Sequence, residues 1–411
     1  MAVRQTERGE PVCHESRQER YRRHKGEGFE MMIAGLFLLL SLLPFHPPCT
    51  LSYKPEVQHC DSIRPFVQID HARPDTVDIT FLGDVMMHEA QIESAYRDGG
   101  YDFSGYFDNI GGLVSGSDLT VANMEFPVGV EPYTGYPCFS APYGILEEAA
   151  SQGIDIMLSA NNHICDKGAK GIKSTLDSFR KLNAEYGTLN TGVYRDREAQ
   201  EKAYPLIIEK NGIRIALLNF TYGTNGIPVP APYRVNDTDT LELKAALERA
   251  ASDSADIIIA LPHWGTEYSP VHDRHQERLA SWLMKNGADA IIGTHPHTPQ
   301  DCSLIDGKPV IYSLGNYISN MSLSGTQIGL AATVRIVRRH GHEAAIKSVS
   351  LEYLWSSRAG FKEKGFTTVI IDEMEGKRDE WLNTHDYDRM MSARKKAEKT
   401  AGTAENILLK L

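Results

Sequence analysis

The sequence contains several short groups of residues of the types that bind metal ions in proteins. Each group directly follows an apolar run. In chain order these groups are Asp84, Asn123 with Glu125, Asn162 with His163, His263, and His295 with His297. Carboxylate oxygens, amide oxygens and imidazole nitrogens are the ligands with which proteins hold divalent Mn, Fe or Zn. Two such ions about 3.5–4 Å apart can clamp a phosphate group and activate water for its hydrolysis. The sequence therefore predicts a centre for one or two divalent metal ions.

Each group has a simpler explanation when it is taken alone. Asn161 or Asn162 is a good helix cap, and Asp84 after a glycine is common in turns. This alternative predicts no tight metal and little effect of replacing His295. Other catalytic templates are absent from the sequence, which contains no Gly-x-Ser-x-Gly elbow, no Walker A loop and no His-Glu-x-x-His helix.

Short apolar strands are expected to position these groups. The expected strands span residues 76–82, 118–122, 154–158, 256–261 and 288–292. Between these strands the apolar residues have the spacing of helices, over residues 89–97, 103–110, 168–183, 240–252 and 273–286. Strands that alternate with helices predict an α/β fold. In such folds ligands collect beyond the carboxyl ends of the strands, where all of these groups would lie.

The remaining elements are expected at turns and near the C-terminus. Asn211-Gly212 supplies the positive φ values of a hairpin turn, and Asp306-Gly307 is expected to do the same. Strand-like runs at residues 330–337, 345–354 and 366–371 could add an antiparallel layer or edge, and a charged helical pattern covers residues 390–411.

The N-terminal part differs in composition from the rest. Residues 1–30 are polar and Arg-rich, and we expect them to be disordered or an over-extended reading frame. Residues 31–49 hold a short apolar run, which is typical of a signal peptide because a membrane span needs about 20 residues. Residues 50–75 are expected to be a linker, residues 76–340 the metal-binding domain, and residues 341–411 C-terminal strands with a helical tail.

This pattern predicts export to the periplasm or cell surface, with residues 31–49 either cleaved or kept as a membrane anchor. Export makes the cysteines relevant. Cys60, Cys138, Cys165 and Cys302 permit three pairings, and their spacing favours none of these.

The charge balance excludes one class of partner. The formal net charge is −11, and the sequence offers no long basic stripe that could displace counterions from nucleic acid. An anionic ligand would need local positive charge, such as that of metal ions.

The motifs, taken in order, resemble one family. They are Gly-Asp-Val-Met (83–86), Asn-Met-Glu (123–125), Asn-Asn-His-x-x-Asp (161–166), His-Trp-Gly-x-Glu (263–267), Gly-x-His-Pro-His (293–297) and Ser-Leu-Gly-Asn-Tyr (313–317). Over roughly residues 77–337 this set resembles the CapA family of poly-γ-glutamate capsule biosynthesis proteins. That family is similar to the calcineurin-like metallophosphoesterases, so the resemblance implies a four-layer α/β/β/α sandwich with a two-metal site.

The resemblance also implies roles for individual residues. The implied metal ligands are Asp84, Glu125, Asn162, His263, His295 and His297. The implied catalytic residues are His163, which would protonate the leaving oxygen as a general acid, and Asp166. The implied substrate-binding residues are Asn123, Asn161, Glu267 and Asn316.

This sequence departs from the superfamily pattern at two places. Met86 stands where the superfamily has a metal-binding His, with His88 two residues further on. Glu125 stands where the superfamily has an Asp that bridges both ions. These departures bear directly on whether two ions are held.

Two functions from different classes follow. The first is an exported, metal-dependent hydrolase-like protein of capsule or cell-envelope polymer synthesis that cleaves a phosphate ester or another polymer linkage. The second is a non-catalytic envelope protein that binds or guides an anionic polymer during export. The expected partners are an anionic envelope or capsule polymer or a phosphorylated substrate, together with membrane-bound capsule synthesis proteins. Metal-dependent turnover discriminates the two functions.

Overall fold

The computed structural model describes residues 75–401 and 409–410. The predicted disordered stretch, signal segment and linker before residue 75 lie outside the described residues. Within the described part, no helix is long and apolar enough to cross a membrane.

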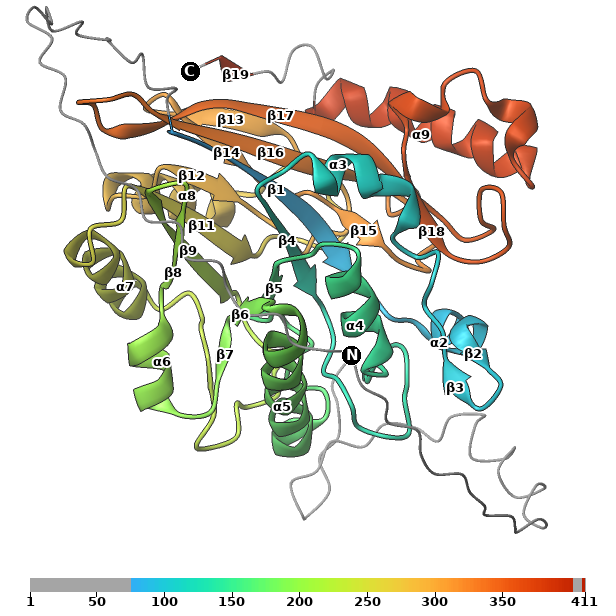
Figure 1. The fold of residues 1–411 in the computed structure, drawn as a ribbon, viewed down its shortest axis with the longest axis horizontal. Helices are drawn as coiled ribbons and strands as arrows, with labels where there is room; N and C mark the ends of the chain where they lie inside the picture. Colours follow the sequence, from blue (N-terminus) through green and yellow to red (C-terminus); the bar gives the residue numbers. More distant parts are fainter. Residues whose placement is uncertain (1–74, 402–408, 411) are drawn as a thin grey trace, which may run out of the picture. The chain divides into compact units, whose positions relative to one another are not determined.

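Two large sheets form the centre of the fold (Figure 1). The first sheet runs in the order β18 (Thr367–Ile370), β17 (Ala344–Ser357), β16 (Ile328–Arg338), β1 (Asp75–Val85), β4 (Leu119–Met124), β5 (Ile156–Leu158) and β6 (Leu189–Thr191), with β15 (Asn316–Ile318) paired to β1 and β19 (Leu409–Lys410) to β17. The second sheet runs in the order β13 (Cys302–Ile305), β14 (Lys308–Ile311), β12 (Ala290–Ile292), β11 (Ile257–His263), β9 (Ile213–Thr221) and β8 (Leu206–Lys210). Two small ribbons pair β2 (Tyr96–Arg97) with β3 (Gly100–Tyr101), and β7 (Val193–Tyr194) with β10 (Arg234–Val235).

Helices cover the outer face of each sheet. The α-helices are α2 (Glu89–Ala95), α3 (Gly111–Ser115), α4 (Gly144–Ser151), α5 (Gly168–Tyr186), α6 (Arg197–Ala203), α7 (Thr240–Ser252), α8 (Arg274–Lys285) and α9 (Thr384–Ala401), and the short 3-10 helices are η2 (Asp108–Ile110), η3 (Asp372–Met374) and η4 (Arg378–Glu380). Apolar side chains of α4 and α5 pack on the first sheet, and those of α7 and α8 pack on the second.

A third apolar core lies between the two sheets. Ile79 and Val121 of the first sheet are buried in one cluster with Ile215 and Ile259 of the second. Because each sheet has one face against the other and one face against helices, the layers run helix, sheet, sheet, helix. The predicted four-layer α/β/β/α sandwich is therefore confirmed.

The strand directions bring the carboxyl ends of several strands to one region. In the first sheet β1 pairs in parallel with β4, and β4 with β5. In the second sheet β11 pairs in parallel with both β9 and β12. The C-terminal strands β16, β17 and β18 instead extend the first sheet as an antiparallel edge, one of the two arrangements that the sequence left open.

Most expected elements occur within a few residues of their predicted ends. The Asn211-Gly212 hairpin has the predicted left-handed residues, with φ of 49° and 73°. The prediction of a helix over residues 103–110 is wrong for most of its length. Gly105 has a φ of 86°, which interrupts a helix, and only η2 forms. The C-terminal helix begins earlier than expected, at Thr384. Just before it, the side chain of Asn383 accepts a hydrogen bond from the backbone N–H of His385.

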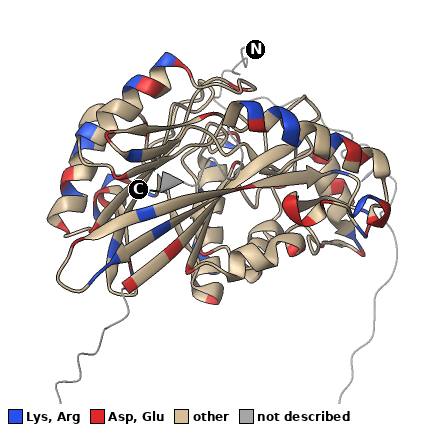
Figure 2. Cartoon of the chain, turned by 90° about the horizontal axis from the view of Figure 1, so that it is seen from above, with Lys and Arg blue, Asp and Glu red and all other residues tan. Residues whose placement is uncertain are grey.

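Lys and Arg are interspersed with Asp and Glu over the described residues rather than gathered into one stripe (Figure 2).

Candidate metal centre

Asp84 lies at the end of β1, where two backbones approach closely. Its Oδ1 accepts a hydrogen bond of 2.7 Å from Asn123 Nδ2, and its Oδ2 accepts one of 3.2 Å from the backbone N–H of His295. Gly83 permits this approach, since a Cβ atom there would lie 1.9 Å from the carbonyl oxygen of Gly315. The carboxylate is fully buried and fixed by groups at the ends of two other strands, β4 and β12.

Glu125 follows β4 and carries the most unusual group of the site. The residue is completely buried, and neither carboxylate oxygen has a hydrogen-bond partner. Its Oε1 lies 3.7 Å from Nε2 of His263 and 3.7 Å from Nε2 of His297. Burial, and then the neighbouring Asp84, raise the pKa of Glu125 well above its usual range. A buried carboxylate without partners is costly unless a cation joins it.

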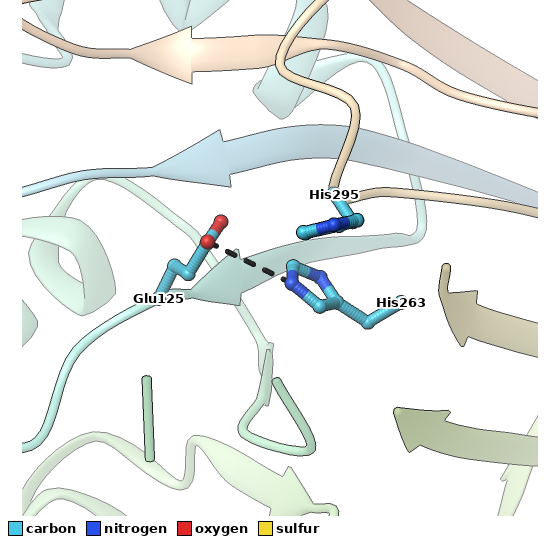
Figure 3. A group of neighbouring side chains, drawn as sticks. All are labelled: Glu125, His263 and His295. Carbon is cyan, nitrogen blue, oxygen red and sulfur yellow. Dashed lines mark ion pairs between the residues drawn. The ribbon is translucent and has the colours of Figure 1, made fainter. Parts of the chain in front are cut away.

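His263 and His295 face Glu125 from the second sheet (Figure 3). Both imidazoles are buried, and their ring centres lie 4.8 Å apart. Burial, followed by the charge of neighbouring histidines, lowers the pKa of both rings well below the usual value. Neutral imidazole is the form that binds metal, so both histidines are held in a ligating state. Nδ1 of His295 also has no hydrogen-bond partner.

The backbone at His295 and His297 adopts a conformation that non-glycine residues rarely take. The φ angles are 101° at His295 and 58° at His297. Such a conformation costs on the order of 1–3 kcal/mol per residue and clusters at functional sites. Here it directs both rings of the His-Pro-His segment toward the carboxylates, and Nδ1 of His297 lies 3.4 Å from Oδ2 of Asp84.

Two ligand sets meet at Glu125. One joins Glu125, His263 and His295, and the other joins Asp84, Glu125 and His297, with all ligand atoms of a set within 4.8 Å of one another. The donor set of carboxylates and imidazoles suits divalent Mn, Fe or Zn. The unpartnered oxygens of Glu125 and the unpartnered Nδ1 of His295 fit the same conclusion, because a cation would satisfy them.

Asn162 joins the same cluster. Its Oδ1 lies 2.8 Å from Nε2 of His263, and its Nδ2 donates to Asn225 Oδ1 at 3.3 Å. Capping does not explain it, because the following helix α5 has Lys167 at its N-cap. The helix-cap explanation therefore does not apply to Asn162.

His163 and Asp166 form a buried pair at the edge of the cluster. Nδ1 of His163 lies 2.8 Å from Oδ2 of Asp166, which also accepts the backbone N–H of Phe139 at 2.7 Å. The ring of Phe139 stands edge-on to that of His163 at 4.6 Å. This arrangement fixes the ring, and the role of His163 as a general acid stays a prediction.

The predicted substrate-binding asparagines are buried and use their amides within the protein. Asn161 donates to the backbone of Met124 at 2.8 Å and accepts from the N–H of His163 at 3.2 Å. Asn316 Oδ1 lies 3.0 Å from Nδ1 of His297, and its Nδ2 donates to the carbonyl of Thr326 at 2.9 Å. These contacts position the histidines, while substrate binding by these residues stays a prediction.

Glu267 is the exposed member of the predicted set. Its carboxylate lies with His295 and His297 in a third group that could hold a metal ion. Its substrate-binding role stays a prediction, and the geometry also offers it as a ligand at the open side of the centre.

The departures in the first motif have a clear structural basis. Met86 is fully buried in the apolar core between the first sheet and its helices, so it offers no ligand. His88 does not replace it: its Nδ1 lies 3.2 Å from Oε1 of Gln91, and its ring packs edge-on against Phe139. Burial lowers the pKa of His88 to about 4.

Sequence reasoning missed two residues of the centre. Tyr222 directly follows β9, and its ring centre lies 4.6 Å from that of His295. Thr294 places Oγ1 at 3.0 Å from Nδ1 of His263 and so orients that ring. The strand-end rule applied to β9 would have found Tyr222, whereas a hydroxyl beside a ligand leaves no pattern in the sequence.

The sequence of this chain is similar to those of known proteins. The model of the family described as bacterial capsule synthesis protein PGA_cap matches residues 78–321. The capsule biosynthesis protein CapA of Bacillus anthracis is 27% identical over 284 residues, which cover 66% of each chain. The PGA biosynthesis protein CapA of Bacillus subtilis (strain 168) is 29% identical over 262 residues, which cover 62% of this chain and 66% of the relative. The chain thus spans slightly less than two thirds of the length of these curated relatives.

Solved structures with a similar arrangement include the calcineurin-like phosphoesterase YfkN from Bacillus subtilis, with a TM-score of 0.43, 14% identity and coverage of 80% of this chain and 99% of that chain. Another is a putative 5'-nucleotidase from Staphylococcus aureus, with a TM-score of 0.44, 12% identity and coverage of 78% and 58%. The sequence match over residues 78–321, which contains every ligand of the candidate centre, decides the family. The chain belongs to the bacterial capsule synthesis protein family PGA_cap.

Proposed function

We propose that the chain is an exported capsule-polymer synthesis protein that uses its metal centre to hydrolyse a phosphate ester or another linkage of the polymer or its precursor. The observation that carries this proposal is Glu125, whose two buried oxygens have no partner and whose carboxylate belongs to both ligand sets. A shared carboxylate between two sets is the arrangement that can hold two ions side by side.

Six residues would hold the divalent ions, namely Asp84, Glu125, Asn162, His263, His295 and His297. Such ions would supply Lewis-acid activation of water and of the oxygen atoms of the bond that is cleaved. The protein's own residues would do the rest. His163, held by Asp166, would donate a proton to the leaving oxygen, and Tyr222 and Glu267 would border the substrate at the open side.

A second candidate function is supported by the first motif. Met86 is buried in the core and His88 is engaged with Gln91, so this chain lacks the nitrogen ligand that the superfamily pattern has in its first motif. A weaker centre would suit a protein that binds or guides an anionic polymer without cleaving it. Membrane-bound capsule synthesis proteins are the proposed partners in either case.

Turnover tests the two functions directly. The metal-loaded protein should hydrolyse a generic phosphodiester, lose this activity on chelation and regain it with Mn, Fe or Zn. His163→Ala should lose activity while keeping its metal. A protein that binds metal fully and shows no turnover with phosphodiesters or capsule polymer would contradict hydrolysis and support the binding function.

A further inference from the structure

A cavity of about 520 Å³ lies between α9 and the segment that contains residues 322–325. This volume is in the range of small-molecule and oligomer sites, about 300–1,000 Å³. The lining combines hydroxyl groups, such as those of Ser392 and Thr400, with the apolar surfaces of Ile328 and Trp355. None of the roles assigned above uses this cavity.

The cavity is positively charged in a chain whose net charge is −11. Its lining includes Arg389 and Lys396 of α9 and no Asp or Glu. Among the described residues, no carboxylate lies within salt-bridge distance of Lys396. Arg389 is held in place by Gln327, by Asp386 at 3.8 Å and by the ring of Trp355 at 5.7 Å. The cavity therefore presents one fixed cation and one unpaired cation.

The cavity and the metal centre share a wall. Tyr268 lines the cavity, and its ring centre lies 6.1 Å from that of His297. Thr298, which directly follows His297, lines the cavity as well. The segment is anchored by hydrogen bonds from Tyr268 N to the carbonyl of Pro296 at 2.8 Å and from Thr298 Oγ1 to the carbonyl of Ser269 at 3.1 Å. One extended ligand could therefore contact both places.

We infer that this cavity binds the carboxylate-bearing stretch of an acidic polyamide chain while another part of the same chain lies at the metal centre. The cations would pair with carboxylates, the hydroxyls would donate to carboxylate oxygens, and Ile328 and Trp355 would contact the methylene groups. A compact phosphate ester would be held by the metal centre alone and would not need this second cationic surface. The inference rests on the proposed role in capsule-polymer synthesis.

Lys396→Glu tests the inference, with Lys395→Glu as the matched control. Both lysines are exposed on α9, and Lys395 does not line the cavity. The probe is a γ-linked glutamate oligomer, with its Kd measured by calorimetry at two salt concentrations. We expect Lys396→Glu to weaken binding at least tenfold, and Lys395→Glu to change it less than twofold, with less difference between the two at high salt.

Metal content and phosphodiester hydrolysis are measured on the same samples, so that the two proposals can fail separately. We expect both to be unchanged in Lys396→Glu, because Lys396 is not part of the metal centre. Equal effects of the two lysine variants on oligomer binding, or Lys396-dependent binding of inorganic phosphate without binding of the oligomer, would overturn the inference. Absence of hydrolysis in the unmodified protein, with Lys396-dependent oligomer binding retained, would overturn the hydrolase proposal alone.

Discussion

Nε2 of His263 lies 3.7 Å from Oε1 of Glu125, although the two residues come from different sheets and are both fully buried. The separation is too long for a hydrogen bond and short enough for both atoms to bind one ion. The fold thus keeps an imidazole and an unpartnered carboxylate facing each other at the carboxyl ends of β4 and β11.

Metal binding should release protons. Because the pKa of Glu125 is raised by burial and by Asp84, the metal-free protein keeps a proton there to a higher pH than an ordinary carboxyl group does, and an ion must displace this proton. Affinity for a divalent ion should therefore increase with pH until Glu125 ionises. Calorimetry in buffers of different ionisation enthalpy measures this release. Glu125→Gln should reduce the number of released protons, and an unchanged number would contradict the assignment.

Glu125 should make a contribution to the stability of the metal-free protein that is lost as pH rises, opposite in sign to that of His263 and His295, whose lowered pKa adds stability as pH rises. A group whose pKa is higher in the folded state than in the unfolded state contributes stability to the fold. This contribution is complete below the unfolded-state pKa, about 4.5 for Glu, and it is lost as pH rises through the folded-state pKa. Saturating divalent metal should remove this loss. Thermal unfolding with and without chelator measures it, and the metal-free Glu125→Gln variant should lack this falling component. Equal slopes for both proteins would count against a protonated Glu125.

Asp166→Asn should slow catalysis without removing metal. The carboxylate of Asp166 lies 2.8 Å from Nδ1 of His163, and an amide in its place would no longer stabilise the protonated ring. We expect kcat to fall about 10²- to 10⁴-fold for substrates with alkyl leaving groups. Activated nitrophenyl esters should lose much less, because their leaving group needs no proton. An equal loss for both substrate types would indicate that His163 is not the general acid.

Gly83→Ala should destabilise the fold. The new Cβ would lie 1.9 Å from the carbonyl oxygen of Gly315, and both backbones are fixed by the sheet. Overpacking of this kind costs about 1–3 kcal/mol in the free energy of unfolding. Gly112→Ala is the matched control, since nothing lies within 4 Å of its added Cβ and alanine favours the helix α3. Chemical denaturation measures both, and a cost at Gly83 no larger than that at Gly112 would contradict the close approach.

The parts of the site that were predictable from the sequence lie at strand ends. Asp84, Glu125 and His263 each directly follow or end a buried apolar run. Parallel pairing aligns the ends of β1 and β4, and the packing of the two sheets brings the end of β11 to them. The α/β fold followed from the alternation of such strands with amphipathic helices such as α7 and α8, whereas the four layers were implied only by the family resemblance.

Features that depend on tertiary contacts could not be predicted in this way. The left-handed backbone of His295 and His297 is imposed by the surrounding packing, because histidine does not favour it. The contact of Asn316 with His297 joins residues from different loops, and nothing in their spacing indicates it. Similarly, the charged pattern of the C-terminal helix predicted α9 but not the cavity that Arg389 and Lys396 line.

The central claim is that Glu125 and the histidines hold divalent metal and that this metal supports hydrolysis. It is tested by elemental analysis of residues 62–411, together with His295→Ala and a control at the exposed His275 of α8. Hydrolysis of a generic phosphodiester is followed in the same samples. We expect two ions per chain in the unmodified protein and in His275→Ala. In His295→Ala we expect metal and activity to be lost together. One ion or none, without turnover, in the unmodified protein would contradict the central claim.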